Sequence, residues 1–346
     1  MSDVFWIRVT DTCSTIGLFV STFGNITLFV LLIRKSVNGI GTYRYLMISF
    51  CIFSSIFTSL EKFMRPLMHH YKNTLMVLQR KRFDFSDSVA VILSASYCGC
   101  FAMCFVMFAV HFIYRYYVSC QPQKLFHFRG KKLWYWILGM LLVALSWVVT
   151  AYIFFEPDEE TEYELNIVLS TYYGLSREKI GYVPYAFYKT IDHQRVLRPN
   201  TLVGVFHHVV VMQATIYIVF HFGIKTFRRI RNIQAKSVRT KKLQLQLFVA
   251  LVVQTVIPLF LMYLPNMIFT CSALLGGGIG AWANVTVVMN HLYPAIDPFV
   301  ILFIIKGFRD TLIDFFFCRQ KNNKFVSVVS QAARRQQERS VSHIIN

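Results

Sequence analysis

The sequence carries little charge for its length. Of its 346 residues only 15% are charged, whereas 55% are hydrophobic; soluble domains carry about 25% charged residues. The hydrophobic residues also come in long blocks rather than in alternation, which excludes a cytosolic or secreted globular protein. Enzyme motifs are missing too: we find no phosphate loop, no HExxH, no GxSxG and no Cys-x-x-Cys pair with zinc spacing. We therefore expect no enzyme activity, no cofactor and no metal site.

The eight cysteines do not form a disulfide framework. Cys98, Cys100 and Cys104 lie inside one apolar segment, so most of the cysteines are expected to be small, membrane-buried hydrophobic residues. The N-terminus lacks a basic region followed by a cleavable apolar run. We therefore expect the first span to serve as the targeting signal.

Seven segments are long and apolar enough to cross a bilayer, which requires about 20 residues of helix. They are residues 16–33, 45–60, 89–118, 133–155, 202–224, 248–270 and 282–305. This pattern predicts an all-α fold, a seven-transmembrane helix bundle, with six or eight spans as the alternatives. The second span is the weakest because Glu61, Lys62 and Arg65 interrupt it. We expect it to continue to Met68, with these charges near the outer headgroups.

The basic residues indicate the orientation of the bundle. In a soluble protein the net charge of +19 would suggest nucleic-acid binding. In a membrane protein the distribution of the basic residues along the chain indicates the orientation instead. With the N-terminus outside, 24 of the 36 Lys and Arg residues fall in the cytosolic loops and tail, as the positive-inside rule requires. The three cytosolic loops contain no acidic residue, whereas residues 156–199 carry most of the acids on the outer side. Only residues 62–87, outside yet rich in Lys and Arg, argue against this orientation.

Two ionisable residues lie one helical turn apart at the cytosolic end of the third span. His111 and Arg115 occur in the run His-Phe-Ile-Tyr-Arg-Tyr-Tyr. In one interpretation Arg115 extends to the lipid headgroups. In the other it is a switch residue that a cytosolic partner engages when the helices open, because ionisable groups inside spans are costly and usually functional.

The sixth and seventh spans both contain proline, and the seventh also contains an acidic residue. Asp297 lies in Tyr-Pro-Ala-Ile-Asp-Pro, where Pro294 and Pro298 free backbone carbonyls and allow a bend. Asp297 needs a polar partner, and Asn25 of the first span is our candidate. Asp297 belongs either to a structural polar cluster or to a switch that moves on activation, and the sequence favours neither interpretation. Pro258 predicts a kink in the middle of the sixth span.

The segments at the two ends of the bundle carry further signals. His207 and His208 lie near the outer end of the fifth span, where we expect one to line a cavity and the other to contact a neighbouring helix or lipid headgroups. After the seventh span, residues 306–318 predict a short amphipathic helix along the membrane. Cys318 is a candidate palmitoylation site, with an unmodified thiol as the alternative. We thus expect a receptor domain over residues 1–318 and a disordered, basic cytosolic tail over 319–346.

Several sequence blocks, in this order, resemble the nematode seven-transmembrane chemoreceptors of the str group, which includes the diacetyl receptor. They are GTYRYLM (41–47), RPLMH (65–69), KRFDFS (81–86), HFIYRY (111–116), QLFVALVVQTVIP (246–258) and LYPAIDPFVILFIIKGFR (292–309). The resemblance runs nearly end to end. It implies a G protein-coupled receptor for olfaction and chemotaxis, located in the plasma membrane of sensory cilia and responding to small environmental molecules.

The resemblance implies a heterotrimeric G protein and a small odorant as partners, besides membrane lipid and without nucleic acid. For coupling and switching we nominate His111, Tyr114, Arg115, Tyr116, Arg239, Lys241, Lys242, Pro258, Pro294, Asp297 and Pro298. For the ligand we nominate Met103, Met107, His207, Met212, Tyr263, Met267 and Met289, from their helical phase. A ligand-gated cation channel of the seven-span type is the alternative.

Comparison with rhodopsin-like receptors leaves the activation mechanism open. Arg115 stands where those receptors have a switch arginine, but Tyr114 replaces the acid that precedes it. Asp297-Pro298 resembles their seventh-span motif, yet Ile301 stands where a tyrosine is expected.

Overall fold

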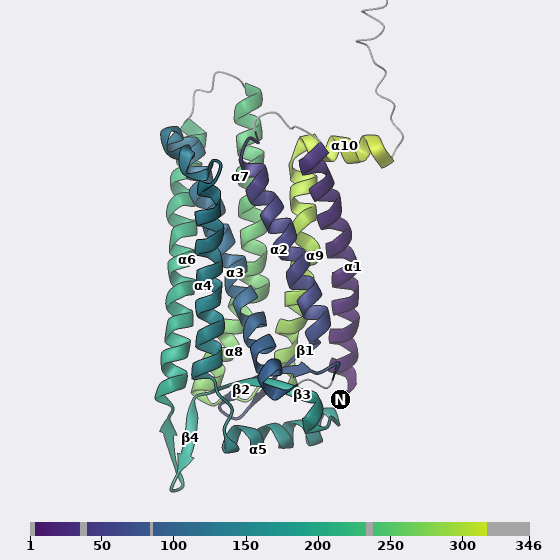
Figure 1. Cartoon of the computed structure of the whole chain (residues 1–346), viewed down its shortest axis with the longest axis vertical. Coiled ribbons are helices and arrows are strands. Elements are labelled where there is room, and N and C mark those ends of the chain that lie inside the picture. Colours follow the sequence, from purple (N-terminus) through teal and green to yellow (C-terminus); the bar gives the residue numbers. More distant parts are fainter. Residues whose placement is uncertain (1–3, 35–39, 84–85, 233–237, 317–346) are drawn as a thin grey trace, which may run out of the picture. The chain divides into compact units, whose positions relative to one another are not determined.

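The computed structural model describes residues 4–34, 40–83, 86–232 and 238–316, and seven helical segments in it are long and apolar enough to cross a membrane. Six are single helices: α1 (Val4–Arg34), α2 (Tyr43–Met64), α3 (Asp87–Cys120), α4 (Lys132–Phe154), α6 (Pro199–Asn232) and α9 (Asn284–Ile304). The remaining one joins α7 (Val238–Pro258), a π-helical turn η4 (Leu259–Tyr263) and α8 (Leu264–Leu275). Figure 1 shows them side by side. The predicted seven-transmembrane bundle is confirmed.

Most spans are longer than the sequence predicts. The first begins at Val4 instead of residue 16, and the fifth runs to Asn232 instead of residue 224. The second span ends at Met64 rather than Met68, so this expectation is wrong. Arg65 adopts a left-handed conformation with φ 50°. Pro66 follows it, and a residue before proline is disfavoured in the helical region, which ends α2 here.

Proline interrupts the sixth span where the sequence predicts a kink. The α-helix α7 ends at Pro258, and the next five residues form the π-helical turn η4. A proline lacks the N–H of a helical hydrogen bond and clashes with the preceding turn, and π-turns are a frequent way to accommodate such a defect. The π-helical turn therefore allows α7 and α8 to differ in direction.

Glycine permits the closest approaches between helices. At Gly24 of α1 a Cβ atom would lie 2.6 Å from Cγ of Pro298 on α9. At Gly99 of α3 it would lie 2.4 Å from Cγ2 of Val148 on α4. Small residues are enriched at helix contacts in membranes because packing, rather than the hydrophobic effect, drives association there.

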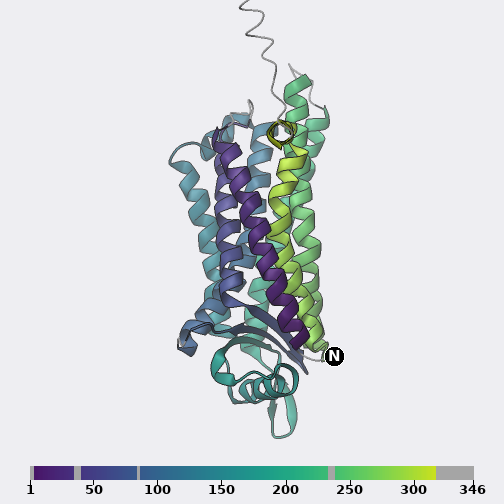
Figure 2. The same cartoon turned by 90° about the vertical axis from the view of Figure 1, so that its right-hand side faces the viewer.

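One end of the bundle is covered by a three-stranded antiparallel sheet that the sequence pattern does not predict. Strands β1 (Pro66–Tyr71) and β2 (Thr74–Arg80) form a hairpin, and β3 (Ile180–Ala186) pairs with β2. Leu78 faces Leu67 in one pairing and Tyr182 in the other. Figures 1 and 2 show the sheet at the end of the bundle where the described chain begins.

A short helix covers the other face of the sheet. Helix α5 (Glu159–Val168) and the π-turn η2 (Leu169–Tyr173) pack on the sheet through an apolar cluster. Its buried members are Leu67, Met76, Leu78, Leu165, Val168, Leu169, Tyr173, Ile180 and Tyr182. Asp158 begins α5 through a capping box with Thr161, which satisfies free N–H groups of the first turn. The sheet therefore lies between α5 and the bundle.

The remaining elements are short. Strands β4 (Tyr188–Ile191) and β5 (Gln194–Leu197) form an exposed hairpin, and 3₁₀ turns lie at η1 (Pro122–Phe128), η3 (Arg177–Lys179) and η5 (Ala281–Ala283). The chain divides by its contacts into residues 1–305 and 306–346. In the second unit, α10 (Lys306–Phe316) is the short helix that the sequence predicts after the seventh span. Cys318 and the tail 319–346 lie outside the described residues, so the domain boundary at 318 stays a prediction.

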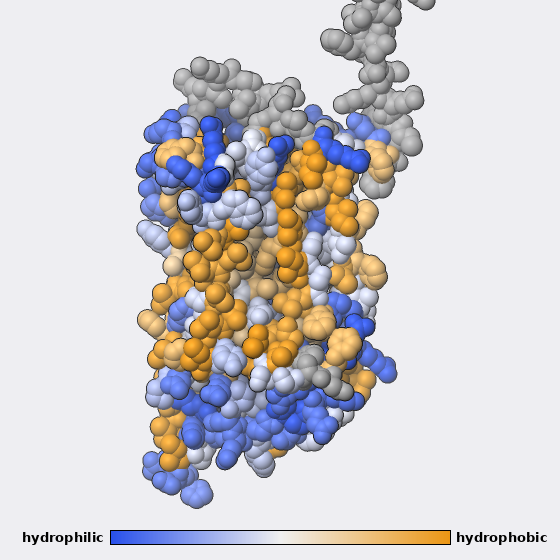
Figure 3. All heavy atoms as spheres, viewed as in Figure 1, coloured by the Kyte–Doolittle hydropathy of each residue, from blue (hydrophilic) through white to orange (hydrophobic). Residues whose placement is uncertain are grey.

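The side of the bundle that Figure 3 displays has a hydrophobic band between two polar ends. Helix α4 contributes Leu138, Leu141, Leu142, Leu145 and Val149 to the apolar surface, all more than 45% exposed. A contiguous exposed apolar surface of this extent marks contact with lipid rather than with water.

Candidate functional site

A cavity of about 110 Å³ lies within the bundle, directly beneath the sheet. It is lined by α3, α4, α6, η4, α8 and α9, together with all three strands of the sheet. The lining residues are Met68, Leu75, Val77, Tyr97, Cys98, Phe101, Trp147, Tyr185, Val205, His208, Val209, Met212, Tyr263, Asn266, Met267, Thr270 and Asn290. No Lys, Arg, Asp or Glu is among them. Such an apolar cavity with a few polar groups is typical of a small-molecule site.

The sheet forms one wall of this cavity. Leu75 and Val77 of β2 face the cavity, whereas Met76 and Leu78 face the apolar cluster beneath α5. Every residue of β2 is therefore buried, on one face or the other. This double burial explains why the segment lacks the alternation of apolar and polar residues by which a strand is recognised.

Three of the seven nominated ligand residues line the cavity: Met212, Tyr263 and Met267. His207 does not line it, and its Nδ1 lies 3.2 Å from Oγ1 of Thr150 on α4. The adjacent His208 does, with its ring stacked on Trp147 at a centroid distance of 3.9 Å. Successive helical residues point about 100° apart, so only one of the two histidines faces this cavity, and it is His208 rather than the nominated His207.

The nominated methionines on α3 and α9 lie outside the cavity lining. Met103 and Met107 are 8% and 1% exposed, within the core of the bundle. The α3 face toward the cavity carries Tyr97, Cys98 and Phe101, and at 100° per residue Met103 and Met107 point well away from it. Met289 likewise does not line the cavity, whereas its neighbour Asn290 does.

A buried polar chain runs from the cavity into the bundle, and it centres on Glu61 of α2. The Tyr97 hydroxyl donates to Oε1 of Glu61 at 3.4 Å and accepts from Nδ2 of Asn290 at 3.0 Å. Oε2 of Glu61 lies 3.2 Å from Nδ1 of His291 on α9. Glu61 is fully buried, so its expected place near the outer headgroups is wrong. The available signal was its occurrence in a span, since such acids usually face the bundle interior.

Asp297 is buried in α9 and paired with the sixth span. Nε2 of Gln254 donates to its Oδ2 at 2.8 Å, and its Oδ1 has no hydrogen-bond partner among the described residues. The predicted partner Asn25 instead donates to Ser21 and Ser54 at 3.0 and 3.1 Å. The prediction failed because it matched polar residues by depth in the membrane and could not know which helix faces Asp297.

Arg115 points into the bundle at the end opposite the sheet. Its side chain is 1% exposed, which contradicts the interpretation that it extends to the lipid headgroups. Nη2 donates to both Oε1 and the backbone carbonyl of Gln244 on α7, at 2.6 and 2.9 Å. The guanidinium also lies 5.4 Å from the ring centre of Tyr43, within cation–π range. Arg115 thus ties the third span to the sixth.

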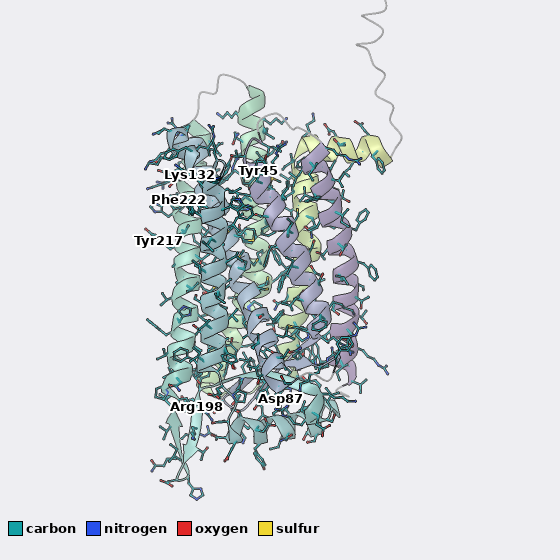
Figure 4. All side chains as sticks on the ribbon, viewed as in Figure 1. Tyr45, Asp87, Lys132, Arg198, Tyr217 and Phe222 are labelled. Atoms are coloured by element: carbon teal, nitrogen blue, oxygen red, sulfur yellow. The ribbon has the colours of Figure 1, made fainter. Side chains whose placement is uncertain are left out.

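Aromatic side chains surround this arginine. His111 is buried with its Nδ1 3.4 Å from the Tyr43 hydroxyl. Tyr114 stacks on Tyr43 at 5.1 Å, and its hydroxyl lies 3.0 Å from Oγ1 of Thr42. Tyr116 faces another way and packs on Phe222 of α6 at 5.0 Å; Figure 4 labels Phe222 near this end of the bundle.

The other nominated switch residues are dispersed. Lys241 donates to the backbone carbonyl of Arg231 at 3.4 Å, and Lys242 is exposed. The side chain of Arg239 lies outside the described residues. Pro294 and Pro298 are buried in α9, which is assigned as one continuous helix through both.

At the sheet end, cations are paired with acids. Asp11 of α1 binds Arg65 and Arg80, each at 2.6 Å, and Lys81 binds Asp87. Figure 4 labels Asp87 at this end. These pairs give three of the six basic residues of 62–87 a carboxylate partner, and Asp11 is shared by two of them.

Buried histidines fix the sheet to the bundle. Nδ1 of His69 lies 3.2 Å from the Tyr173 hydroxyl, which accepts a hydrogen bond from Asn284 of α9 at 2.9 Å. Burial, reinforced by the adjacent His70, lowers the pKa of His69 from 6.5 to about 4. Within the part of the chain that the structure describes, no three His, Cys, Asp or Glu residues are grouped to hold a metal ion.

Comparisons with known proteins agree with this architecture. Residues 10–313 match the family model described as serpentine type 7TM GPCR chemoreceptor Str. The chain is 36% identical to serpentine receptor class r-10 of Caenorhabditis elegans, over 93% of this chain and 95% of that protein. It is 28% identical to the Caenorhabditis elegans G-protein coupled receptor str-217, over 88% and 89% of the two chains. Among solved structures, squid rhodopsin matches with a TM-score of 0.55 at 11% identity, over 94% of this chain and 90% of that one.

Proposed function

Because the chain belongs to the Str family of serpentine seven-transmembrane chemoreceptors, we propose that it senses small apolar molecules, volatile odorants among them, in the cavity beneath the sheet. The observation that carries this proposal is the cavity itself. It is lined by α3, α4, α6, η4, α8, α9 and the sheet, and no charged side chain is among the lining residues. A lining of this kind favours small, weakly polar ligands over ionic ones.

The proposed orientation has the N-terminus and the sheet outside the cell and the Arg115 end in the cytosol. The distribution of basic residues supports it. The Arg115 end has 24 of the 36 basic residues in its loops and the tail. The number of basic residues near the ends of the spans, rather than the net charge, determines topology.

In the proposed mechanism, α3 and α7 move apart. A ligand shifts the receptor only through tighter binding to one of its conformations. The cavity contacts α8, which is joined to α7 through the π-turn after Pro258. Movement of α8 around a ligand would be transmitted to α7 and would break the contact between Arg115 and Gln244. A heterotrimeric G protein would then bind between the separated helices.

The cellular setting follows from the family and stays part of the proposal. We place the receptor in the plasma membrane of sensory cilia, where it would serve olfaction and chemotaxis. Cys318 after α10 would carry a palmitoyl group that anchors the tail.

The test is a reporter assay in cells that express the chain with a heterotrimeric G protein. Small volatile molecules are screened against the wild type and an Arg115→Ala variant, both normalised to surface expression. We expect ligand-dependent signalling in the wild type and its loss in the variant. Ligand binding without any reporter response, or normal signalling by Arg115→Ala, would disprove the coupling assignment. A ligand-evoked current that persists without G protein would favour a cation channel.

A further inference from the structure

A groove of about 600 Å³ lies between the fifth and sixth spans, apart from the cavity beneath the sheet. We call it the side groove. It is lined by side chains within residues 105–112 of α3, 215–231 of α6 and 248–259 of α7 and η4. Phe220 and Ile224 on one wall and Val249 and Val256 on the other are each more than 40% exposed. The side groove is therefore open at the flank of the bundle, where the surface meets lipid.

Three buried phenylalanines of α3 form the floor of the side groove. Phe105, Phe108 and Phe112 follow the spacing that places side chains on one helical face. Opposite Phe112, Gly223 of α6 has no side chain, and a Cβ there would lie 3.1 Å from the Phe112 ring. Helix α6 therefore lies close to α3 at this point, and the space of the groove lies between α6 and α7.

The lining of the side groove is apolar over most of its length. Besides two arginines at one end, its only polar side chains are Thr215 and Thr255. Their hydroxyls donate to the backbone carbonyls of Val211 and Leu251, at 2.7 and 2.8 Å. The depth of the groove therefore suits a hydrocarbon rather than a polar group.

Two exposed arginines mark one end of the side groove. Arg228 and Arg231 lie three residues apart on α6, which places them on one helical face. Neither guanidinium has a salt bridge to any described residue, and residues 225–242 contain no acid. From Thr215 to Arg231 the helix rises about 24 Å. The groove thus combines a long apolar channel with two cations that lack an anion.

From this arrangement we propose that an anionic phospholipid binds in the side groove, with one acyl chain between α6 and α7 and its headgroup on Arg228 and Arg231. Guanidinium groups match phosphate geometry and bind it bidentately. A cavity of about 150 Å³ holds benzene, so the groove of about 600 Å³ has room for a much longer hydrocarbon. In the proposed orientation the two arginines face the cytosolic leaflet, where the anionic lipids are found.

The test uses the purified full chain, as a single copy in each nanodisc of phosphatidylcholine, with a small share of a photoreactive lipid. That lipid is either phosphatidylserine or phosphatidylcholine with the same photoreactive acyl chain, and mass spectrometry identifies the cross-linked residues. The yield over a series of lipid fractions gives the apparent affinity. We expect cross-links on the lining residues of α6 and α7. Phosphatidylserine should bind about five- to thirtyfold more tightly, since each arginine near an anionic headgroup contributes about fivefold.

Paired charge variants separate the side groove from general attraction to the basic end of the bundle. Arg228→Gln with Arg231→Gln should abolish the preference for phosphatidylserine. Lys225→Gln with Arg229→Gln removes the same charge from the same helix, at exposed positions that do not line the groove. This control should keep the preference.

A second pair of variants tests the place of the acyl chain. Val219→Trp fills part of the side groove and should lower the cross-linking of both lipids there severalfold. Val210→Trp, on a lipid-exposed part of α6 outside the groove, should leave it unchanged.

Several results would overturn the proposal: equal affinity of the two lipids in the wild type, the same loss of preference in both charge variants, or groove cross-linking that Val219→Trp does not alter. Absence of lipid cross-links on the lining residues would overturn it too, as expected if a helix of another protein covers the groove. Lipid binding is measured without ligand or G protein, so it stands or fails separately from the proposed function.

Discussion

Loss of the Gln244 side chain should activate the receptor without a ligand. Oε1 of Gln244 accepts a hydrogen bond from Arg115 at 2.6 Å, and the arginine side chain is 1% exposed, so solvent screening is small. A hydrogen bond to a charged group contributes about 1.5–3 kcal/mol. Gln244→Leu removes this bond and leaves only the one to the backbone carbonyl at 2.9 Å. If the active conformation is populated to about 1%, this change raises it to between about 10% and 60%.

The assay is ligand-independent G protein signalling in cells, normalised to the amount of receptor at the surface. Gln246→Leu is the matched control, because Gln246 lies on the same helix and makes no hydrogen bond among the described residues. We expect raised basal activity in Gln244→Leu and wild-type activity in Gln246→Leu. The same basal activity in wild type, Gln244→Leu and Gln246→Leu would refute the role of the contact between α3 and α7.

Three further predictions concern stability, measured as thermal unfolding of the purified chain. Glu61→Leu removes the acceptor of the Tyr97 hydroxyl and the carboxylate that lies 3.2 Å from Nδ1 of His291, and should cost about 1–3 kcal/mol. Glu61→Leu with His291→Leu should cost less than the sum of the single changes, and strict additivity would speak against the pair. The native pKa of His69, lowered to about 4 by burial, lies below the unfolded value, so the unfolded chain binds more protons between pH 6.5 and 4. Stability should thus fall by up to about 3 kcal/mol as the pH drops through that window, and His69→Gln should flatten this dependence; an equally steep pH dependence in the variant would contradict it. Gly99→Ala places a Cβ 2.4 Å from Cγ2 of Val148 and should lower the free energy of unfolding by about 1–3 kcal/mol. Gly139→Ala is the control: its added Cβ meets no neighbouring group within 4 Å, so the change should be neutral or stabilising. Equal unfolding midpoints in the two variants would argue against tight packing between α3 and α4.

The bundle could be predicted because each membrane span is recognised from one continuous stretch of sequence. Apolar length identifies each crossing without knowledge of its neighbours, and Pro258 marks the change in the sixth span for the same local reason. The sheet could not be predicted in this way. Residues 74–80 are buried on both faces, one by the bundle and one by α5, so their composition resembles that of any other buried apolar segment.

The candidate site was predicted only as far as helical phase could be known. Met212, Tyr263 and Met267 line the cavity, whereas Met103 and Met107 lie off the relevant face of α3. It was harder still to predict which polar side chains pair between helices. Asp297 is bound by Gln254 rather than Asn25, since pairing depends on how the helices are rotated, which single spans do not encode. Arg115 was singled out because an ionisable group inside a span is costly, and its role as a switch stays a prediction.

G protein coupling is measured most directly with the purified full chain in phospholipid vesicles that contain a heterotrimeric G protein. Guanine-nucleotide exchange and cation flux are recorded in the same vesicles as a small volatile molecule that is active in the reporter screen is added. A ligand-gated receptor with the cavity beneath the sheet predicts faster nucleotide exchange with no cation flux. Cation flux evoked by that molecule without any change in nucleotide exchange would contradict it.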